Sequence, residues 1–381
     1  MPKRETTARA GAVRRAVRLG GWVLVVFNCV AAVLVLGPLS PSVCAGDPKL
    51  DGSTLQAQLD ALKPGDTLTL EPRVYEHDAV IRLTVPGVHI DGNGATLRAT
   101  NDQTSAVQIT ADDVAVSDLN LTAPAEGQRW AGLDQHKIVV SGDRDTLTGV
   151  SVVGSAAAGV FITGAQGFRL DNVNVTGTRA DGIHVTGGST GGVLENVRTD
   201  QTGDDGIAVV SYGNESPCRD IHIAHATVGS TRWGRGIAVV GARDVSVQDF
   251  TIANTSSAGL YVASEGAPYF TDSVDAVTIS RGSLTAANQD PGVIQGAILI
   301  YSGNAGRMVD NVRISDVTVT ATPDSAGRDV GITVDSGSVS GISLTDISVN
   351  GSGVTPFDTN APAGSVTTSG WTHDQNPITV G

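Results

Sequence analysis

The chain has 381 residues and is acidic, with 39 Asp and Glu against 25 Lys and Arg and a formal net charge of −14. A surface of this sign repels nucleic acid and anionic membranes, which excludes a general nucleic-acid-binding role. Aromatic residues make up only 4% of the chain and there are 47 glycines, a composition typical of short strands joined by frequent turns.

Residues 1–46 have the features of an export signal. Basic side chains precede an apolar run over residues 22–36, and "SVCAG" places small residues before a candidate cleavage point. The alternative is an uncleaved membrane anchor, although an apolar run of about 15 residues falls short of the ~20 that span a bilayer. We therefore expect a secreted or cell-surface protein that touches a membrane only through this segment. Residues 47–381 carry a charge of −19 and one cysteine, Cys218, so no internal disulfide is expected.

The segment "STLQAQLDALKPGD" predicts a short amphipathic helix from Leu55 to Leu62, ended by Pro64 and Gly65. It comes just before the first strand-like run. We expect this helix to cover the open end of the first strands, because an uncovered strand edge invites aggregation.

Short apolar runs then recur along the chain with a repeat of 22 to 30 residues over its central part. The members are "KIVV" at 137, "GVFI" at 159, "GIHV" at 182, "GIAV" at 206, "GIAV" at 236, "GLYV" at 259, "AILI" at 297 and "GITV" at 331. No helical pattern of ten residues separates them. Two or three short strands in each repeat predict an all-β fold, a single-stranded right-handed parallel β-helix over residues 47–350. Residues 351–381 lack the periodicity and are expected to form a closing tail.

Alternation of side chains along each strand predicts which residues leave the core. Val160, Ile183 and Ile207 should point inward, and their neighbours Phe161 and His184 outward. The residue before each repeat glycine forms a column with one member per coil, ~4.8 Å apart. This column contains His136, Ala158, Asp181, Asp205, Arg235 and Ala258.

The column brings carboxylates together. Asp181 and Asp205 fall on adjacent coils, and Asp204 stands beside Asp205. Three close carboxylates cannot all ionise easily, so one should stay protonated near neutral pH. An acid beside a carboxylate is what glycosidic bond hydrolysis requires. Further candidates for substrate binding on the same face are Arg235, His184, Tyr261, Trp233, Arg232 and His136.

Residues 155–265 resemble the polygalacturonase-like family of glycoside hydrolases, within the pectin-lyase-like superfamily. The stretches that carry the resemblance are "TRADGIHVTGG", "TGDDGIAVVS", "GRGIAVVGARDVSVQDFTIAN" and "SSAGLYVAS". The resemblance implies an inverting hydrolase in which Asp204 is the general acid and Asp181 and Asp205 activate the water. Acid and base in an inverting enzyme are ~6.5–9.5 Å apart, so we expect this gap between Asp181 and Asp204.

Several family positions are changed. Arg235 replaces the histidine of the family's Gly-His-Gly, Leu260-Tyr261-Val262 replaces Arg-Ile-Lys, and Arg179-Ala180 replaces Asn-Thr. In the family, the lost basic residues hold the substrate carboxylate. Polygalacturonate is therefore a poor candidate, and a neutral or differently charged glycan is expected, with Trp233 or Tyr261 as a stacking platform.

Two other functions remain open. "GLDQHK" at 132–137 resembles a stretch of mannuronan epimerases, and a polysaccharide lyase or C5-epimerase could use Arg235, His184, His136, Lys137 or Tyr261 to remove a proton next to a carboxylate. A non-catalytic, glycan-binding β-helix is the third possibility, because Asp-Gly is also an ordinary bend. Ca²⁺ would also suit an aspartate pair. No regular calcium-binding repeat is present, so we predict no metal. We also predict no cofactor, and we expect the protein to be a monomer.

Overall fold

The computed structural model of the protein describes residues 48–381. The predicted export signal or anchor lies outside these described residues. The described residues fall in one compact unit. Within the described part, no helix is both long and apolar enough to cross a membrane.

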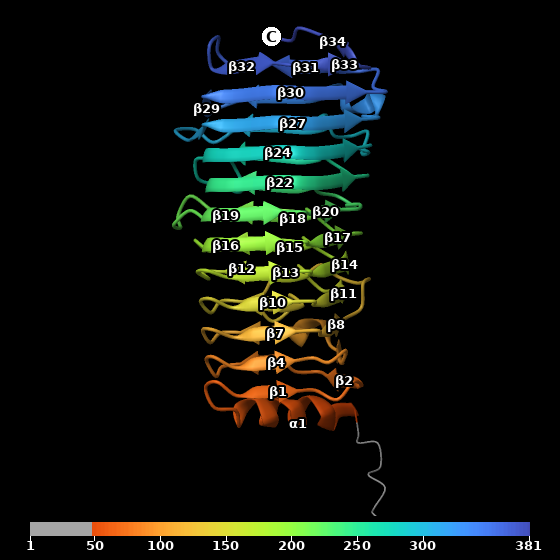
Figure 1. Ribbon diagram of the computed structural model, residues 1–381, viewed down its shortest axis with the longest axis vertical. Helices are drawn as coiled ribbons and strands as arrows, with labels where there is room; N and C mark the ends of the chain where they lie inside the picture. The colour runs from red at the N-terminus through yellow and green to blue at the C-terminus, as the bar shows by residue number, and fades with distance from the viewer. Residues whose placement is uncertain (1–47) are drawn as a thin grey trace, which may run out of the picture. The chain divides into compact units, whose positions relative to one another are not determined.

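The strands of successive coils stack in parallel, so the described chain forms the predicted parallel β-helix (Figure 1). An 11-stranded sheet runs along one side of the stack. Its strands are β3 (Ile81–Leu83), β6 (Val107–Ile109), β9 (Ile138–Val140), β12 (Val160–Thr163), β15 (Ile183–Thr186), β18 (Ile207–Val210), β21 (Ile237–Val240), β23 (Leu260–Ser264), β25 (Ile298–Ser302), β28 (Arg328–Val334) and β31 (Thr355–Thr359).

A 21-stranded sheet forms the other sides of the coils. Its strands are β1 (Thr67–Thr69), β2 (Val74–His77), β4 (His89–Asp91), β5 (Thr96–Ala99), β7 (Ala115–Ser117), β8 (Asn120–Thr122), β10 (Thr146–Thr148), β11 (Ser151–Ser155), β13 (Arg169–Asp171), β14 (Asn174–Thr178), β16 (Thr190–Glu195), β17 (Arg198–Asp200), β19 (Arg219–Ala224), β20 (Thr227–Val228), β22 (Arg243–Ala253), β24 (Asp275–Thr285), β27 (Val312–Thr320), β30 (Ile342–Asn350), β32 (Val366–Ser369), β33 (Thr372–His373) and β34 (Asn376–Pro377). Strands β26 (Met308–Asp310) and β29 (Ser338–Ser340) pair separately, and 3-10 turns occupy Asp102–Thr104 and Asp324–Ala326.

The core is a continuous column of aliphatic side chains inside the coils. Val160, Ile183 and Ile207 are fully buried and belong to one cluster that runs from the first coil to the last. Their partners are aligned between coils, with Val160 opposite Ile183 and Ile183 opposite Ile207. The predicted inward face is confirmed. Its stabilisation comes from burying apolar area that one coil alone could not remove from water.

Helix α1 (Pro48–Asp60) covers the first coil, as predicted, but begins and ends earlier than the apolar pattern suggested. Leu55 and Leu59 are buried against the core. The side chain of Gln56 accepts a hydrogen bond from the N–H of Arg82 at 2.8 Å and donates one to its carbonyl oxygen at 2.9 Å. Because Arg82 lies in β3, at the end of its sheet, Gln56 satisfies backbone groups that would otherwise be unpaired.

The stack continues beyond residue 350, where the sequence pattern ended. Strand β31 pairs with β28, and β32 and β33 both pair with β30. Strands therefore continue into the expected tail, because the preceding coil offers a strand edge with which they can pair. Trp371 is buried and its indole N–H donates to the carbonyl oxygen of Leu344 at 3.1 Å.

The outward face of the 11-stranded sheet was expected to be exposed, but it is covered at β18, β21 and β23. Ala208, Ala238 and Tyr261 point away from the core column, yet all three are buried. They form a second, small apolar cluster with Leu299 and neighbouring alanines. Side chains that alternation places outside are thus covered here.

The repeat glycines allow the coils to approach closely, and Gly159 tests this. An added Cβ would lie 2.3 Å from Val175 Cγ1 and 2.8 Å from the carbonyl oxygen of Gly182 in the next coil. Gly159→Ala should therefore lower the free energy of unfolding by about 1–3 kcal/mol through overpacking. Val153→Thr is the control, because this exposed position should change stability by less than about 0.5 kcal/mol. Equal denaturation midpoints for the two variants would contradict the argument.

Candidate active site

Three consecutive coils bring Asp181, Asp205 and Arg235 into one column. Each residue stands two positions before the first residue of its strand, in β15, β18 and β21, and these strands pair in register. The backbone N–H of Asp205 donates to Asp181 Oδ1 at 3.0 Å, and the N–H of Arg235 donates to Asp205 Oδ1 at 2.6 Å. Each aspartate of the column therefore holds the backbone of the next coil as well as facing outward.

Asp204 lies beside this column and has no such bond to the next coil. Its carboxylate Oδ2 accepts a hydrogen bond from Arg129 Nη2 at 2.7 Å, across 75 positions of sequence. Its other oxygen, Oδ1, packs against Gly234, where an added Cβ would approach it to 2.5 Å. The Asp204 carboxylate fits in this place because residue 234 has no side chain.

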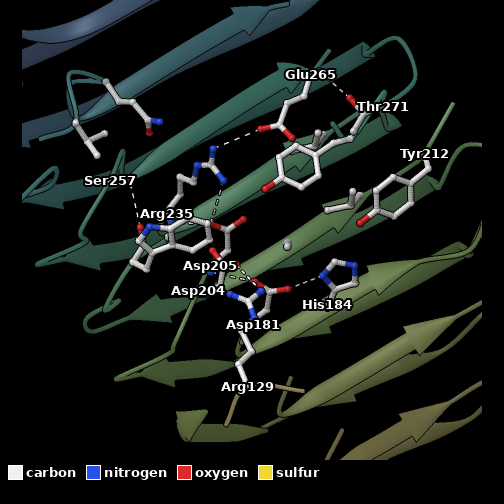
Figure 2. Close-up of a pocket in the computed structure, with 18 residues that line it drawn as sticks. Arg129, Asp181, His184, Asp204, Asp205, Tyr212, Arg235, Ser257, Glu265 and Thr271 are labelled. Carbon is white, nitrogen blue, oxygen red and sulfur yellow. Dashed lines mark hydrogen bonds and ion pairs between the residues drawn. The ribbon is translucent and has the colours of Figure 1, made fainter. Parts of the chain in front are cut away.

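The three carboxylates converge as predicted (Figure 2). One oxygen of each lies within 4.8 Å of an oxygen of the other two. This value joins the nearest oxygens and not the centres of the carboxyl groups, so the gap of ~6.5–9.5 Å between the Asp181 and Asp204 carboxyls stays a prediction. The oxygens come this close because Asp204 and Asp205 leave the same turn and both face Asp181.

Burial, more than the repulsion between the carboxylates, changes the ionisation of two of the three groups. Burial, and then the charge of Asp181, raise the pKa of Asp204. Burial raises the pKa of Asp205 well above its ordinary value, although Arg235 opposes this shift. The site therefore holds a proton more firmly than an exposed carboxylate would, as the sequence predicted.

His184 reaches the site from β15. Its Nδ1 lies 2.6 Å from Asp181 Oδ2, and its ring stacks on Phe161 at 5.1 Å between centroids. Phe161 stacks in turn on His136 at 4.0 Å. His136 itself is buried, and its Nδ1 accepts the N–H of Ala158, so it does not line the pocket as a substrate contact. Burial, and then His184, lower the pKa of His136 to about 4.

Arg235 lines the opposite side of the pocket, and Tyr261 packs behind it. The guanidinium of Arg235 lies 4.3 Å from the ring centre of Tyr261 and 3.4 Å from Glu265, whose carboxylate accepts the Tyr261 hydroxyl at 3.0 Å. Tyr261 is only 3% exposed. It cannot serve as the predicted stacking platform, because the apolar cluster and Arg235 cover its ring.

A pocket of about 540 Å³ opens above these groups. Trp233 lines it and is 58% exposed, so its ring face is accessible. Arg232 lies outside the lining and pairs with Glu126 at 3.3 Å. Among the charged and aromatic lining residues, the sequence reasoning missed Arg129, Tyr212, Glu265 and Tyr269. The last three lie in two enlarged coils, where the segments "SYGNESPCRD" (211–220) and "ASEGAPYFTDSVD" (263–275) lengthen the repeat. That extra length was the available signal, whereas nothing in the sequence marked Arg129.

Each carboxylate already has its own protein partner. Asp181 binds His184, Asp204 binds Arg129, and Asp205 accepts the Arg235 N–H and faces its guanidinium at 3.8 Å. Two positively charged arginines lie beside these three carboxylates, which we call the trio, and they compete with any cation for the same oxygens. We therefore assign no metal or cofactor to this site.

Comparisons with known proteins identify the architecture. A family model described as "Right handed beta helix region" matches residues 138–347, more than half of the chain. A search of curated proteins returned no significant match.

Solved structures share the fold at low sequence identity. The catalytic domain of a GH87 alpha-1,3-glucanase in complex with nigerose has a TM-score of 0.62 and 20% identity, covering 90% of this chain and 69% of that chain. The Agl-KA catalytic domain has a TM-score of 0.63 and 15% identity, covering 84% and 62%. The A-module of mannuronan C-5 epimerase AlgE4 from Azotobacter vinelandii has a TM-score of 0.57 and 15% identity, covering 85% and 98%. Among the solved GH87 alpha-1,3-glucanases are variants with alanine in place of one of three aspartates.

Replacing Asp204 with Asn should stabilise the protein at alkaline pH. Because the pKa of Asp204 is raised on folding, the folded state loses stability as the pH rises from the unfolded-state pKa through the folded-state pKa. Asn cannot ionise, so the free energy of unfolding should be about 1 kcal/mol higher than that of the wild type near pH 8. The difference should vanish near pH 3, where the carboxyl is protonated in both states.

Urea denaturation at both pH values measures this effect. Asp171→Asn is the control, because hydrogen bonds from Asn196 and Arg169 lower the pKa of Asp171 and its removal should give no gain. A less stable Asp204→Asn variant at alkaline pH would show that the site carries no electrostatic strain.

Proposed function

The chain belongs to the right-handed β-helix family, and on this scaffold we propose that it is a glycoside hydrolase acting on a neutral glycan. The observation that carries the proposal is Asp204. Asp181 and Asp205 have a structural use, because each accepts a backbone N–H from the next coil. Asp204 has none of these bonds, yet it is held close to two other carboxylates at the floor of a pocket. A fold gains nothing from this repulsion, whereas an acid catalyst depends on it.

The roles follow from the surroundings of each carboxyl. Asp204, with its raised pKa, donates a proton to the leaving glycosidic oxygen. Asp181 and Asp205 have oxygens within 4.8 Å of each other, a distance that one water can bridge with two hydrogen bonds of ~2.8 Å. That water attacks the anomeric carbon as the bond to the leaving oxygen breaks, and it gives its proton to one of these two carboxylates. Trp233 supplies an exposed ring on which a sugar face can stack.

The solved GH87 alpha-1,3-glucanases support the choice of these three aspartates. In their alanine variants, the second replaced aspartate lies 23 positions after the first, and the third is adjacent to the second. Asp181, Asp204 and Asp205 have the same spacing. In a β-helix, such spacing places the first aspartate on one coil and the adjacent pair on the next coil.

Charge favours a neutral substrate. The two arginines that line the pocket, Arg129 and Arg235, are both paired with carboxylates. No lining cation of the described pocket is therefore left to bind a uronate carboxylate. Residues 47–381 also carry a charge of −19, which repels a polyanion. An α-1,3-linked glucan is the first candidate. From the export features of residues 1–46 we expect the reaction to take place outside the cell.

We propose that the reaction inverts the anomeric configuration. A retaining enzyme needs a carboxylate oxygen that is free to attack the sugar. Both oxygens of Asp181 are hydrogen-bonded, and Asp205 is only 6% exposed with Oδ1 bound to the Arg235 N–H. A water held between them reaches the sugar more readily than either carboxylate.

The lyase or epimerase alternative has less support. It is favoured by the likeness to the epimerase module, of which this chain covers 98%. The groups expected to remove the proton are, however, already bonded within the protein. Tyr261 is buried and donates to Glu265, and Arg235 forms an ion pair with Glu265. A non-catalytic glycan-binding role would leave the isolated position of Asp204 without a use.

A panel of neutral and acidic polysaccharides, with α-1,3-glucan first, tests the proposal. The wild type should release reducing ends without an ultraviolet-absorbing unsaturated product. Asp204→Asn should lower kcat by about 10²–10⁴-fold, the usual contribution of a general acid. Asp171→Asn, on the far sheet, is the matched control and should keep full activity. Equal rates for Asp204→Asn and wild type exclude the hydrolase assignment, and unsaturated products or uncut, epimerised chains identify the alternative.

The stereochemical outcome is a separate prediction. Proton NMR of the first products, recorded before mutarotation, should show the anomer opposite to that of the cleaved bond. Retention would mean that a carboxylate of the trio attacks the sugar. A substrate whose covalent intermediate breaks down slowly would then label that carboxylate.

A further inference from the structure

An extended loop carries Arg129 to the site. It joins β8 to β9 across residues 123–137, and the buried side chain of Arg179 anchors it from below. Arg179 donates to Asp102 Oδ2 at 2.5 Å and to three loop carbonyl oxygens, those of Pro124 at 2.9 Å, Ala125 at 3.4 Å and Gln128 at 2.9 Å. Its donors are thereby used within the protein, so Arg179 has a structural role and is not a substrate contact.

The loop is also fixed to the coils on either side of the trio. Glu126 pairs with Arg232 at 3.3 Å, and the N–H of Trp130 donates to the carbonyl oxygen of Ala156 at 2.9 Å. Gly127 packs on the Arg179 guanidinium, where an added Cβ would come within 2.7 Å. The backbone around residue 129 is therefore held in place.

The Arg129 side chain, in contrast, is partly exposed where it reaches the pocket. It is 47% exposed, its guanidinium lies 5.9 Å from the ring centre of Trp233, and its ion pair is with Asp204. This pair covers Asp204 Oδ2, while Oδ1 is packed on Gly234. A glycosidic oxygen can therefore reach the acid only if Arg129 moves aside.

Resting on the proposed function, we propose that Arg129 is a positioning residue that keeps Asp204 ionised in the free protein and is displaced when a sugar enters the pocket. Once Arg129 has left, Asp204 takes a proton from solvent and can give it to the leaving oxygen. The exposed Trp233, beside both the guanidinium and the pocket, is the surface on which the entering sugar replaces Arg129.

The charges around Asp204 agree with this order of events. The groups that face it are Asp181 and Asp205 from the column, His184 beside Asp181, Arg129 from the loop and Arg235 from the next coil. Burial, and then Asp181, raise the pKa of Asp204, whereas Arg129 and Arg235 lower it. Arg235 remains bound to Asp205 and Glu265, so Arg129 is the cation whose departure changes Asp204.

The pH dependence of kcat/KM and of kcat tests the proposal, since the first reports the free enzyme and the second the complex. In the wild type, the alkaline limb of kcat should lie at higher pH than that of kcat/KM. Arg129→Met should move the kcat/KM limb up by about one pH unit, a tenfold gain on the alkaline side, because an opposite charge is lost. Its kcat limb should stay where it is, so the two limbs should coincide.

Two variants separate this effect from loss of structure. Arg144→Met removes a matched surface arginine that pairs with Asp113, and it should leave both limbs unchanged. Glu126→Gln removes the loop contact with Arg232 without touching Asp204, and it should also leave both limbs in place. Equal shifts of kcat and kcat/KM in Arg129→Met would mean that Arg129 stays on Asp204 in the complex, which overturns the displacement.

A measurement without substrate keeps the result independent of the proposed function. Carbon-13 NMR of the carboxyls, with Asp204→Asn to assign the signal, should show Asp204 titrating at higher pH in Arg129→Met than in the wild type. An unchanged titration overturns the inference whether or not any glycan is cleaved. A shifted titration in a protein that cleaves no glycan counts against the proposed function alone.

Discussion

The structure depends on the hydrogen bonds that join one coil to the next. In the column that carries the site, side chains take part in this bonding, because the N–H of Asp205 donates to Asp181 and the N–H of Arg235 donates to Asp205. The glycine after each column residue allows the next coil to approach, as at Gly159. Asp181 and Asp205 are therefore placed by the ladder itself, whereas Asp204 is held from outside the ladder by Arg129.

The electrostatic cost of the trio is offset by groups from distant parts of the chain. His184, Arg129 and Arg235 each take one carboxylate, and they come from a strand, a long loop and the next coil. The arrangement gives each carboxylate of the trio a partner although the protein as a whole is strongly acidic. It also explains why the pocket offers no spare cation, which is the physical basis for expecting a neutral substrate.

The pocket owes its shape to the enlarged coils and to the covering of the outer sheet face. Tyr261 and Leu299 are buried in the small outer cluster, and this cluster supports Arg235 from the side opposite the core. Trp233 is left exposed at the rim. A regular β-helix would present a flat face, so the insertions convert a periodic surface into a concave site.

The sequence by itself determined the coil and the column. Alternating Val and Ile, with glycine at a fixed position, is a local pattern, and a solenoid converts local spacing into proximity by repeating one step. The convergence of Asp181, Asp204 and Asp205 could be predicted for this reason. Only the tertiary structure decided the partners of Asp204, the burial of Tyr261 and His136, and the gap between the carboxylates. Arg129 comes from 75 positions away in an aperiodic loop, whose path depends on the buried contacts of Arg179 and not on any repeat.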